Sequence, residues 1–289
     1  MRLHAVGSSK KTMEDPINIV FRLPSTFTRH HRQVITRYLA KGWWQLSPSE
    51  RRAGFEAFNI LHAARVQRGD ESLTFQQVYD VYVDRTWSDR YIGELLVLSN
   101  PAEEHSSLRR RLATLIVTNL RKVGLIQPGV LDSQVLLAYI LHWWESFAAG
   151  YAFEVEIFHD LQESDIKFEA HDLRDRAARR SPYDLKVLGQ PGDVKTSLYF
   201  LQRPQRPLVS QFYITRLDTG RGSRASVVFL KPEAWALIDG ETLFTHLTKL
   251  AEVWPQSTEV QVGPVRLVVA DYQVWKDKVR RKQMQGGSE

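Results

Sequence analysis

The stretch from Ser181 to Phe200, SPYDLKVLGQPGDVKTSLYF, constrains the fold of this chain more than any other segment. Two short runs of strand-forming residues flank a turn signal, which predicts a β-hairpin. The tetrapeptide Gln190-Pro191-Gly192-Asp193 suits a type II turn, because proline fixes φ at the second position and glycine accepts a positive φ at the third. Side chains alternate along a strand, so Asp193 and Lys195 are expected on one face.

Charged side chains gather on this hairpin. Asp184 lies just ahead of the first strand and is expected to come within a few ångströms of Asp193 when the hairpin closes. Two carboxylates so close repel each other unless a divalent cation lies between them, and Mg²⁺ prefers a few oxygen ligands plus water. Because Lys195 would stand beside that cation and help polarise an attacking water, the arrangement indicates phosphodiester hydrolysis.

The same residues resemble a known group of enzymes, the PD-(D/E)xK nuclease superfamily of restriction, repair and recombination. The match consists of Pro182-Tyr183-Asp184 followed by Asp193-Val194-Lys195. Tyr183 separates the proline from the acid, which departs from the motif at its weakest position. The resemblance covers about Leu131 to Asp271.

The resemblance implies a fold, a cofactor and roles for the hairpin residues. The implied fold is α/β, with a restriction-endonuclease-like mixed sheet flanked by helices. The implied cofactor is Mg²⁺ or Mn²⁺, held by Asp184, Asp193 and the backbone carbonyl of Val194. Lys195 would orient or activate the attacking water.

The acid-x-Lys triplet alone is weak evidence, because chance predicts about one in a chain of this composition. The sequence contains three, at Asp165-Ile-Lys167, Asp184-Leu-Lys186 and Asp193-Val-Lys195. The last is favoured by its turn and by the acid upstream. A rival frame pairs Asp165 with the Asp184-Leu-Lys186 triplet but lacks the preceding turn. A third interpretation makes all these side chains solvated charges on a sheet.

A strongly apolar helix is predicted to begin at Asp132-Ser133, and its apolar residues on nearly every side indicate burial between layers. Nucleases of this class often add a glutamate from the first core helix to the metal site, so the resemblance implies Glu145 as a fourth catalytic residue. The next segment, Ala152–Phe158, alternates in polarity and predicts a strand. On that strand Glu154 and Glu156 are expected to face solvent rather than a metal.

Arginines form the densest basic run just before the hairpin, at Arg174, Arg176, Arg179 and Arg180. They are expected either to bind nucleic acid beside the site or to be the solvated face of a helix. The formal net charge of +6 is compatible with a polyanionic partner without requiring one.

The N-terminal part, residues 1–125, is predicted to be a helical domain. Ser47-Pro48-Ser49-Glu50 is a capping box with proline in the first helical turn, and Pro101–Val123 is predicted to be a long helix. The arginines on these helices are compatible with a helix-turn-helix-like module that binds DNA. They are equally compatible with a helical bundle whose arginines form its solvent-exposed face. The proline and glycine of Leu125–Gly129 predict a boundary, with the nuclease-like domain at residues 126–289.

Composition excludes several alternatives. No cysteine is present, so disulfides and thiolate zinc sites are ruled out, and a reducing, cytoplasmic location is expected. The longest nearly apolar run, Val135–Trp144, is too short to span a bilayer, so no membrane partner is expected. The dipeptides His159-Asp160 and His171-Asp172 suggest a His-Asp phosphohydrolase, but that chemistry needs further histidines on a helical bundle.

The sequence therefore predicts an Mg²⁺-dependent deoxyribonuclease. Two alternatives remain: a non-catalytic nucleic-acid-binding or assembly protein of the same fold, and a helical transcription regulator with an appended sensor domain. DNA is the expected partner and RNA stays open. One site per chain suggests a homodimer or a larger nuclease complex for cutting both strands.

Overall fold

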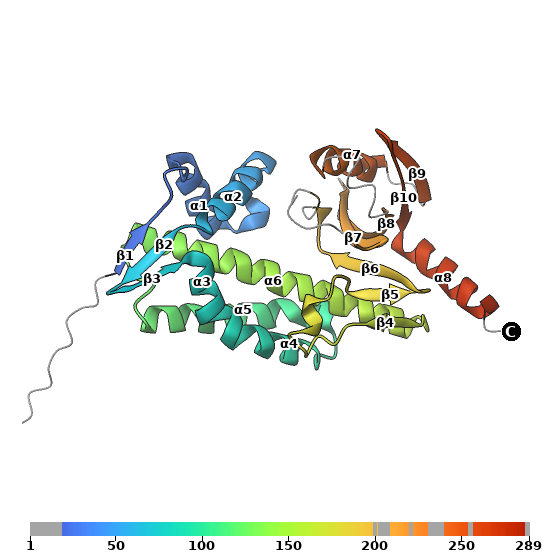
Figure 1. Ribbon diagram of the computed structural model, residues 1–289, viewed down its shortest axis with the longest axis horizontal. Helices are drawn as coiled ribbons and strands as arrows, with labels where there is room; N and C mark the ends of the chain where they lie inside the picture. The colour runs from blue at the N-terminus through green and yellow to red at the C-terminus, as the bar shows by residue number, and fades with distance from the viewer. Residues whose placement is uncertain are drawn as a thin grey trace, which may run out of the picture. The chain divides into compact units, whose positions relative to one another are not determined.

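The computed structural model describes residues 19–198, 201, 209–219, 222–230, 240–253 and 257–286. These residues form a mixed α/β protein with a three-stranded and a seven-stranded sheet (Figure 1). The chain divides into two compact units. The first unit comprises Met1–Trp87 and Leu112–Trp144, and the second comprises Ser88–Arg111 and Glu145–Glu289. The predicted boundary after residue 125 lies within the first unit.

The first unit begins with a small antiparallel sheet and two helices. Its elements are β1 (Ile19–Arg22), α1 (Arg29–Lys41), α2 (Pro48–Leu61), β2 (Arg65–Arg68), β3 (Glu71–Thr74) and α3 (Phe75–Tyr79). The predicted capping box at the start of α2 is confirmed: the Ser47 side chain accepts from the Glu50 amide, and the Glu50 side chain accepts from the Ser47 amide. A π-helical segment, Asp80–Ser88, and helix α4 (Asp89–Leu95) follow α3.

Two long helices each contribute to both units. They are α5 (Pro101–Lys122), which confirms the predicted helix, and α6 (Leu131–Glu163). Between them the chain turns at Gly124, whose φ of 81° suits a residue without a Cβ.

The strand predicted at Ala152–Phe158 is wrong, because these residues belong to α6. Glycine at position 150 is tolerated inside a helix, and no proline interrupts the run from Leu131. The alternation that suggested a strand arises because the helix is enclosed on most sides. Glu154 is itself buried, so polarity along this segment does not report exposure.

The second unit contains the seven-stranded sheet in the order β4-β5-β6-β7-β8-β10-β9. The strands are β4 (Phe168–Ala170), β5 (Leu185–Val187), β6 (Gln190–Lys195), β7 (Phe212–Thr219), β8 (Gly222–Phe229), β9 (Ser257–Val262) and β10 (Val265–Asp271). Strands β6 and β7 are parallel and the other neighbours are antiparallel, so the sheet is mixed as expected.

The β5–β6 hairpin forms as predicted, but its turn is not where the sequence placed it. The chain reverses at Leu188 and Gly189, whose φ values are 52° and 76°. Two positive φ values in a two-residue loop match the twist of the strands they join. Pro191 and Gly192, the expected turn residues, lie inside β6.

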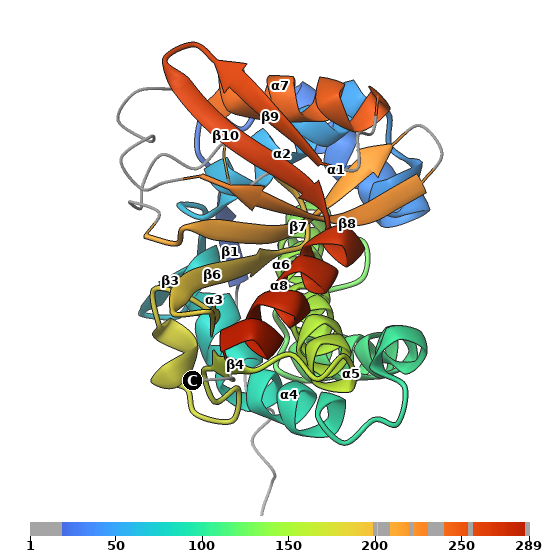
Figure 2. The same ribbon diagram turned by 90° about the vertical axis from the view of Figure 1, so that its right-hand side faces the viewer.

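Helices cover both faces of this sheet (Figure 2). Helix α7 (Gly240–Val253) packs its Leu243 and Leu247 into an apolar cluster with one face of the strands, including Tyr213. Helix α8 (Tyr272–Gly286) lies on the other face, where the ring of Trp275 is centred 5.6 Å from that of Phe212. Across the part of the chain that the structure describes, no helix has the length and apolarity that crossing a membrane requires.

Candidate metal centre

Asp184 immediately precedes β5, and main-chain hydrogen bonds hold it from both sides. Its amide donates to the Gly192 carbonyl at 3.0 Å, and its own carbonyl accepts from the His171 amide at 3.2 Å. The β4-β5-β6 pairing thus continues one residue beyond β5. Asp184 therefore lies between the ends of the two neighbouring strands, where its side chain is held relative to both.

Gly192 is required by packing rather than by the turn. The ring of Phe212, its partner in the register of β6 and β7, occupies the space that a Cβ on residue 192 would need. A glycine at this position leaves room for the Phe212 ring against β6. The ring therefore packs directly ahead of the two charged residues of β6.

The structure brings Asp184, Asp193 and Lys195 together, as the hairpin predicted. The Nζ of Lys195 contacts Oδ1 of Asp193 and lies 3.6 Å from Oδ2 of Asp184. Val194 is buried between the two charged residues of β6, and its amide donates to Oδ2 of Asp184 at 2.7 Å. Lys186 of the rival frame lies elsewhere, with its Nζ 3.7 Å from Glu169 and over the Tyr183 ring.

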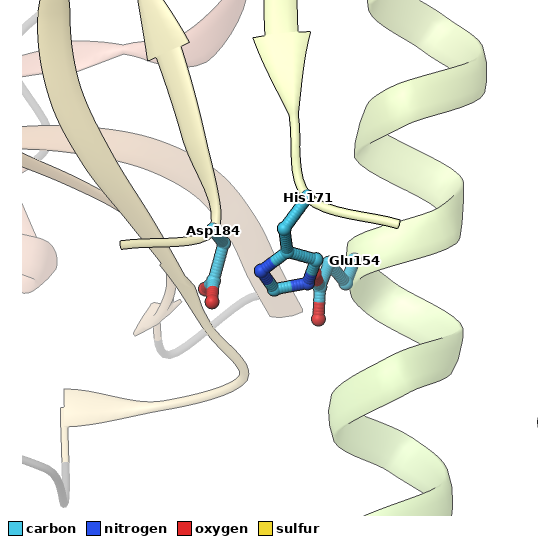
Figure 3. A group of neighbouring side chains, drawn as sticks. All are labelled: Glu154, His171 and Asp184. Atoms are coloured by element: carbon cyan, nitrogen blue, oxygen red, sulfur yellow. The ribbon is translucent and has the colours of Figure 1, made fainter. Parts of the chain in front are cut away.

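Two further side chains reach Asp184 from distant segments of the sequence. Glu154 comes from α6 and His171 from the residue after β4. One ligand atom from each of Glu154, His171 and Asp184 lies within 4.8 Å of the others. Figure 3 shows the imidazole of His171 between the two carboxylates. We call these three residues, together with Asp193 and Lys195, the hairpin cluster.

Glu145 does not belong to this group of ligand atoms among the described residues. It precedes Glu154 by nine positions on α6, which places it about 13 Å away along the helix axis and about half a turn around it. Among the described residues, the glutamate of α6 that lies close to Asp184 is Glu154. Sequence reasoning missed it because Glu154 was assigned to the exposed face of a strand.

Burial and crowding keep protons on two of the carboxyl groups. Burial, opposed by His171 and reinforced by Asp184, raises the pKa of Glu154 to about 7. Burial and the neighbouring carboxylate of Asp184 raise the pKa of Asp193 to about 8, although Lys195 opposes the shift.

The other members of the hairpin cluster favour their charged forms. For Asp184, burial acts to raise the pKa, but Asp193, Lys195 and the Val194 amide together lower it below the usual range. For Lys195, burial acts to lower the pKa, but the Asp184 and Asp193 carboxylates raise it above its usual value. Asp184 is thus the carboxylate that stays ionised throughout the neutral range.

The pKa of the His171 imidazole is also subject to opposing effects. Burial acts to lower its pKa, but Glu154 and Asp184 raise it overall. Its Nε2 lies 2.7 Å from Oε1 of Glu154, yet the pair is misaligned for a hydrogen bond. Within the described part of the chain, both ring nitrogens of His171 and Oε1 of Glu154 lack a hydrogen-bond partner. Buried polar atoms without partners are rare in folded proteins.

A divalent cation fits these observations. The hairpin cluster holds three carboxyl groups against one lysine, and Oε1 of Glu154 and one ring nitrogen of a neutral His171 offer lone pairs. Carboxylate oxygens and imidazole nitrogens are both common ligands of divalent metals. Glu154, His171 and Asp184 would hold such an ion, with Asp193 next to them.

The predicted nucleic-acid-binding arginines fall into two pairs. Arg176 and Arg179 both bind the carboxylate of Asp89 in α4, with Nε of Arg176 2.8 Å from Oδ2. Arg174 and Arg180 are exposed and form no ion pair with any residue the structure describes. The exposed pair is therefore the one available to an anionic partner.

The comparisons with known proteins found no matching family model, no matching curated protein and no matching solved structure.

Proposed function

We propose that this protein is a divalent-metal-dependent endonuclease that hydrolyses phosphodiester bonds of DNA. The observation that carries the proposal is the hairpin cluster: Glu154, His171 and Asp184 converge within 4.8 Å, and Lys195 contacts the adjacent Asp193. Excess carboxylates beside a lysine, with unpartnered buried donors among them, are poorly explained by a purely structural role.

The second unit also supports the restriction-endonuclease-like fold that the motif implies. Such a domain consists of a buried helix, a mixed central sheet and flanking helices. Helix α6 supplies Glu154, the neighbouring strands supply Asp184 and Asp193, and α7 and α8 cover the sheet. A helix and a hairpin that together supply three acids support the proposal.

Each side chain would have a distinct role. A divalent ion would polarise the phosphodiester and acidify the attacking water. Asp184, Asp193, Glu154 and His171 would hold that ion, and the carbonyl of Val194 is a further candidate ligand. Lys195 has a side chain that is 32% exposed, so its Nζ is available to orient the water or to stabilise charge on the phosphate.

The substrate is inferred from charge and not from a groove. Arg174 and Arg180 precede the hairpin and are free to contact a phosphate backbone. With one such cluster among the described residues of each chain, cutting both strands of a duplex would call for two chains.

Metal-dependent nicking of plasmid DNA by the purified full-length chain tests the proposal. Asp193→Asn is nearly isosteric and should abolish cleavage across a Mg²⁺ or Mn²⁺ titration while the fold persists. Asp165→Asn is the matched control, because Asp165 belongs to the rival frame and asparagine tolerates its positive φ of 53°. Equal cleavage by wild type and Asp193→Asn, or loss in Asp165→Asn alone, would refute the assignment.

A further inference from the structure

The imidazole of His171 is held rigidly among carboxylates. Its side chain is only 6% exposed, and its ring packs edge-on to Phe158 with centroids 6.5 Å apart. The main chain of His171 is fixed as well, because its amide donates to the Asp184 carbonyl. The residue therefore has little freedom to turn away from the centre of the hairpin cluster.

The ring nitrogens lack the partners that a structural histidine usually has. Nε2 lies 2.7 Å from Oε1 of Glu154 without making a hydrogen bond, and the structure describes no hydrogen-bond partner for Nδ1. A proton on Nδ1 would leave the lone pair of Nε2 for a metal.

Nitrogen among the ligands bears on which metal the site takes. Mg²⁺ is a hard ion that prefers oxygen ligands in a near-ideal octahedron. An imidazole nitrogen favours first-row transition metals, whereas carboxylates suit Mg²⁺, Ca²⁺ and Mn²⁺ alike. A ligand set of one imidazole and two carboxylates therefore suits Mn²⁺ better than Mg²⁺.

We propose that His171 is a metal ligand and that it makes the hairpin cluster select Mn²⁺ over Mg²⁺. The inference rests on the proposed function only in placing the catalytic metal in the same cluster. Metal binding can be measured without any cleavage, so the two proposals can fail separately.

The test compares the affinities of the metal-free full-length chain for Mn²⁺ and Mg²⁺ by titration calorimetry. Wild type should bind Mn²⁺ more tightly than Mg²⁺. His171→Ala should lose roughly 10–100-fold in Mn²⁺ affinity, by analogy with perturbed metal sites, and much less in Mg²⁺ affinity. His159→Ala, on the same helix as Glu154 but outside the cluster, should keep the wild-type ratio.

A second variant and a spectroscopic readout guard against a folding defect. His171→Asp replaces nitrogen with oxygen and should retain Mg²⁺ binding while losing the preference for Mn²⁺. Pulsed electron paramagnetic resonance of bound Mn²⁺ should show coupling to a ligand ¹⁴N in wild type and none in His171→Asp.

An unchanged affinity ratio in both variants, or no ¹⁴N coupling in wild type, would overturn the inference. Mn²⁺ binding with ¹⁴N coupling but no DNA cleavage would support the inference while refuting the proposed nuclease. Cleavage that needs Asp193 but shows no dependence of metal preference on His171 would do the reverse.

Discussion

Helix α6 carries two buried ionic clusters that differ in how well their charges are balanced. In the first, which we call the α8 cluster, Lys276 of α8 donates to both oxygens of Asp160 at 2.8 and 2.6 Å and to the Ser164 hydroxyl at 3.1 Å. One cation meets one carboxylate, and the three protons of the ammonium group are all used. This arrangement attaches α8 to α6.

The hairpin cluster, six residues earlier on the same helix, is unbalanced. Three carboxyl groups face one lysine, and atoms of Glu154 and His171 remain without hydrogen-bond partners in the described part of the chain. Such a cluster costs stability unless something else enters it. Burial and ion pairing are thus common to both clusters, and the excess of carboxyl groups distinguishes the hairpin cluster.

The strongest effect that we expect distinguishes Lys195 of the hairpin cluster from Lys276 of the α8 cluster. Lys195→Ala should slow single-turnover cleavage by roughly 10²–10⁴, the range for one positioned proton-transfer or electrostatic group. Metal affinity should persist or increase, because the acids remain and a nearby positive charge is gone.

Lys276→Ala is the matched control for this comparison. The folded fraction of that variant should cut at the wild-type rate at saturating metal, although its melting temperature should fall. A Lys195→Ala protein that cuts as fast as wild type would remove the distinction and move the catalytic site away from the hairpin.

The second prediction concerns stability, for which the α8 cluster should matter more than the hairpin cluster. Asp160→Ala leaves the Lys276 ammonium, 8% exposed, without its counter-charge. The unfolding free energy should fall by about 2–3 kcal/mol, below the roughly 3–5 kcal/mol of a fully buried pair, because the Asp160 carboxylate is partly solvated.

Asp193→Asn should behave differently in the same urea titration at pH 7 without metal. Because the pKa of Asp193 is about 8, its carboxyl group is mostly protonated there and resembles the amide that replaces it. The change should stay within about 1 kcal/mol, the scale of one hydrogen bond. A larger loss in Asp193→Asn than in Asp160→Ala would contradict the assignment of the two clusters.

Local signals in the sequence predicted much of the fold and failed at identifiable places. The capping box at Ser47 and the β5–β6 hairpin depend on neighbouring residues and were found. The predicted position of the turn was wrong because Leu188 adopts a positive φ, which is uncommon for leucine and could not be predicted from the residue type. The strand predicted at Ala152–Phe158 failed because a helix enclosed by tertiary packing loses its polar face.

The site followed the same rule. Asp184, Asp193 and Lys195 lie within one hairpin, so spacing and alternation were enough to bring them together. Glu154 and His171 reach the cluster only through the packing of α6 and the β4–β5 pairing. Those interactions join segments far apart in the chain, and spacing in the sequence carries no information about them.

The third prediction uses pH to expose the imbalance of the hairpin cluster. Glu154 and Asp193 have pKa values of about 7 and about 8 when folded, above their usual values of 4.5 and 3.8. The folded state therefore holds more protons than the unfolded chain in this range, and metal-free stability should decrease as pH rises from about 4.5 to 8. The raised pKa of His171 acts in the same direction, because its contribution is lost as pH rises.

Urea unfolding in EDTA should show this decrease, with a slope on the order of 1 kcal/mol per pH unit. Glu154→Gln should reduce the slope, since the amide does not titrate, and Asp193 should account for most of what remains. Adding Mn²⁺ should oppose the trend, because metal binding requires deprotonated ligands and strengthens with pH. Metal-free stability that rises steadily between pH 5 and 8 would show that the acids are not held in their protonated forms.

The weakest effect that we expect extends the comparison to the surface, where paired and unpaired arginines lie close in sequence. Arg176 and Arg179 already bind Asp89, whereas Arg174 and Arg180 have no acidic partner among the described residues. Replacing the unpaired two with glutamine should lower the salt dependence of duplex DNA affinity by about 1.8 in log–log slope, because each phosphate that is no longer neutralised reduces the slope by about 0.9.

Replacing the paired two should change the melting temperature more than the slope, because their charge is already neutralised. Binding isotherms at several salt concentrations, with a melting curve for each variant, measure both quantities. If the paired arginines instead dominate the salt dependence, DNA competes with Asp89 for them, and pairing in the free protein does not mark a structural role.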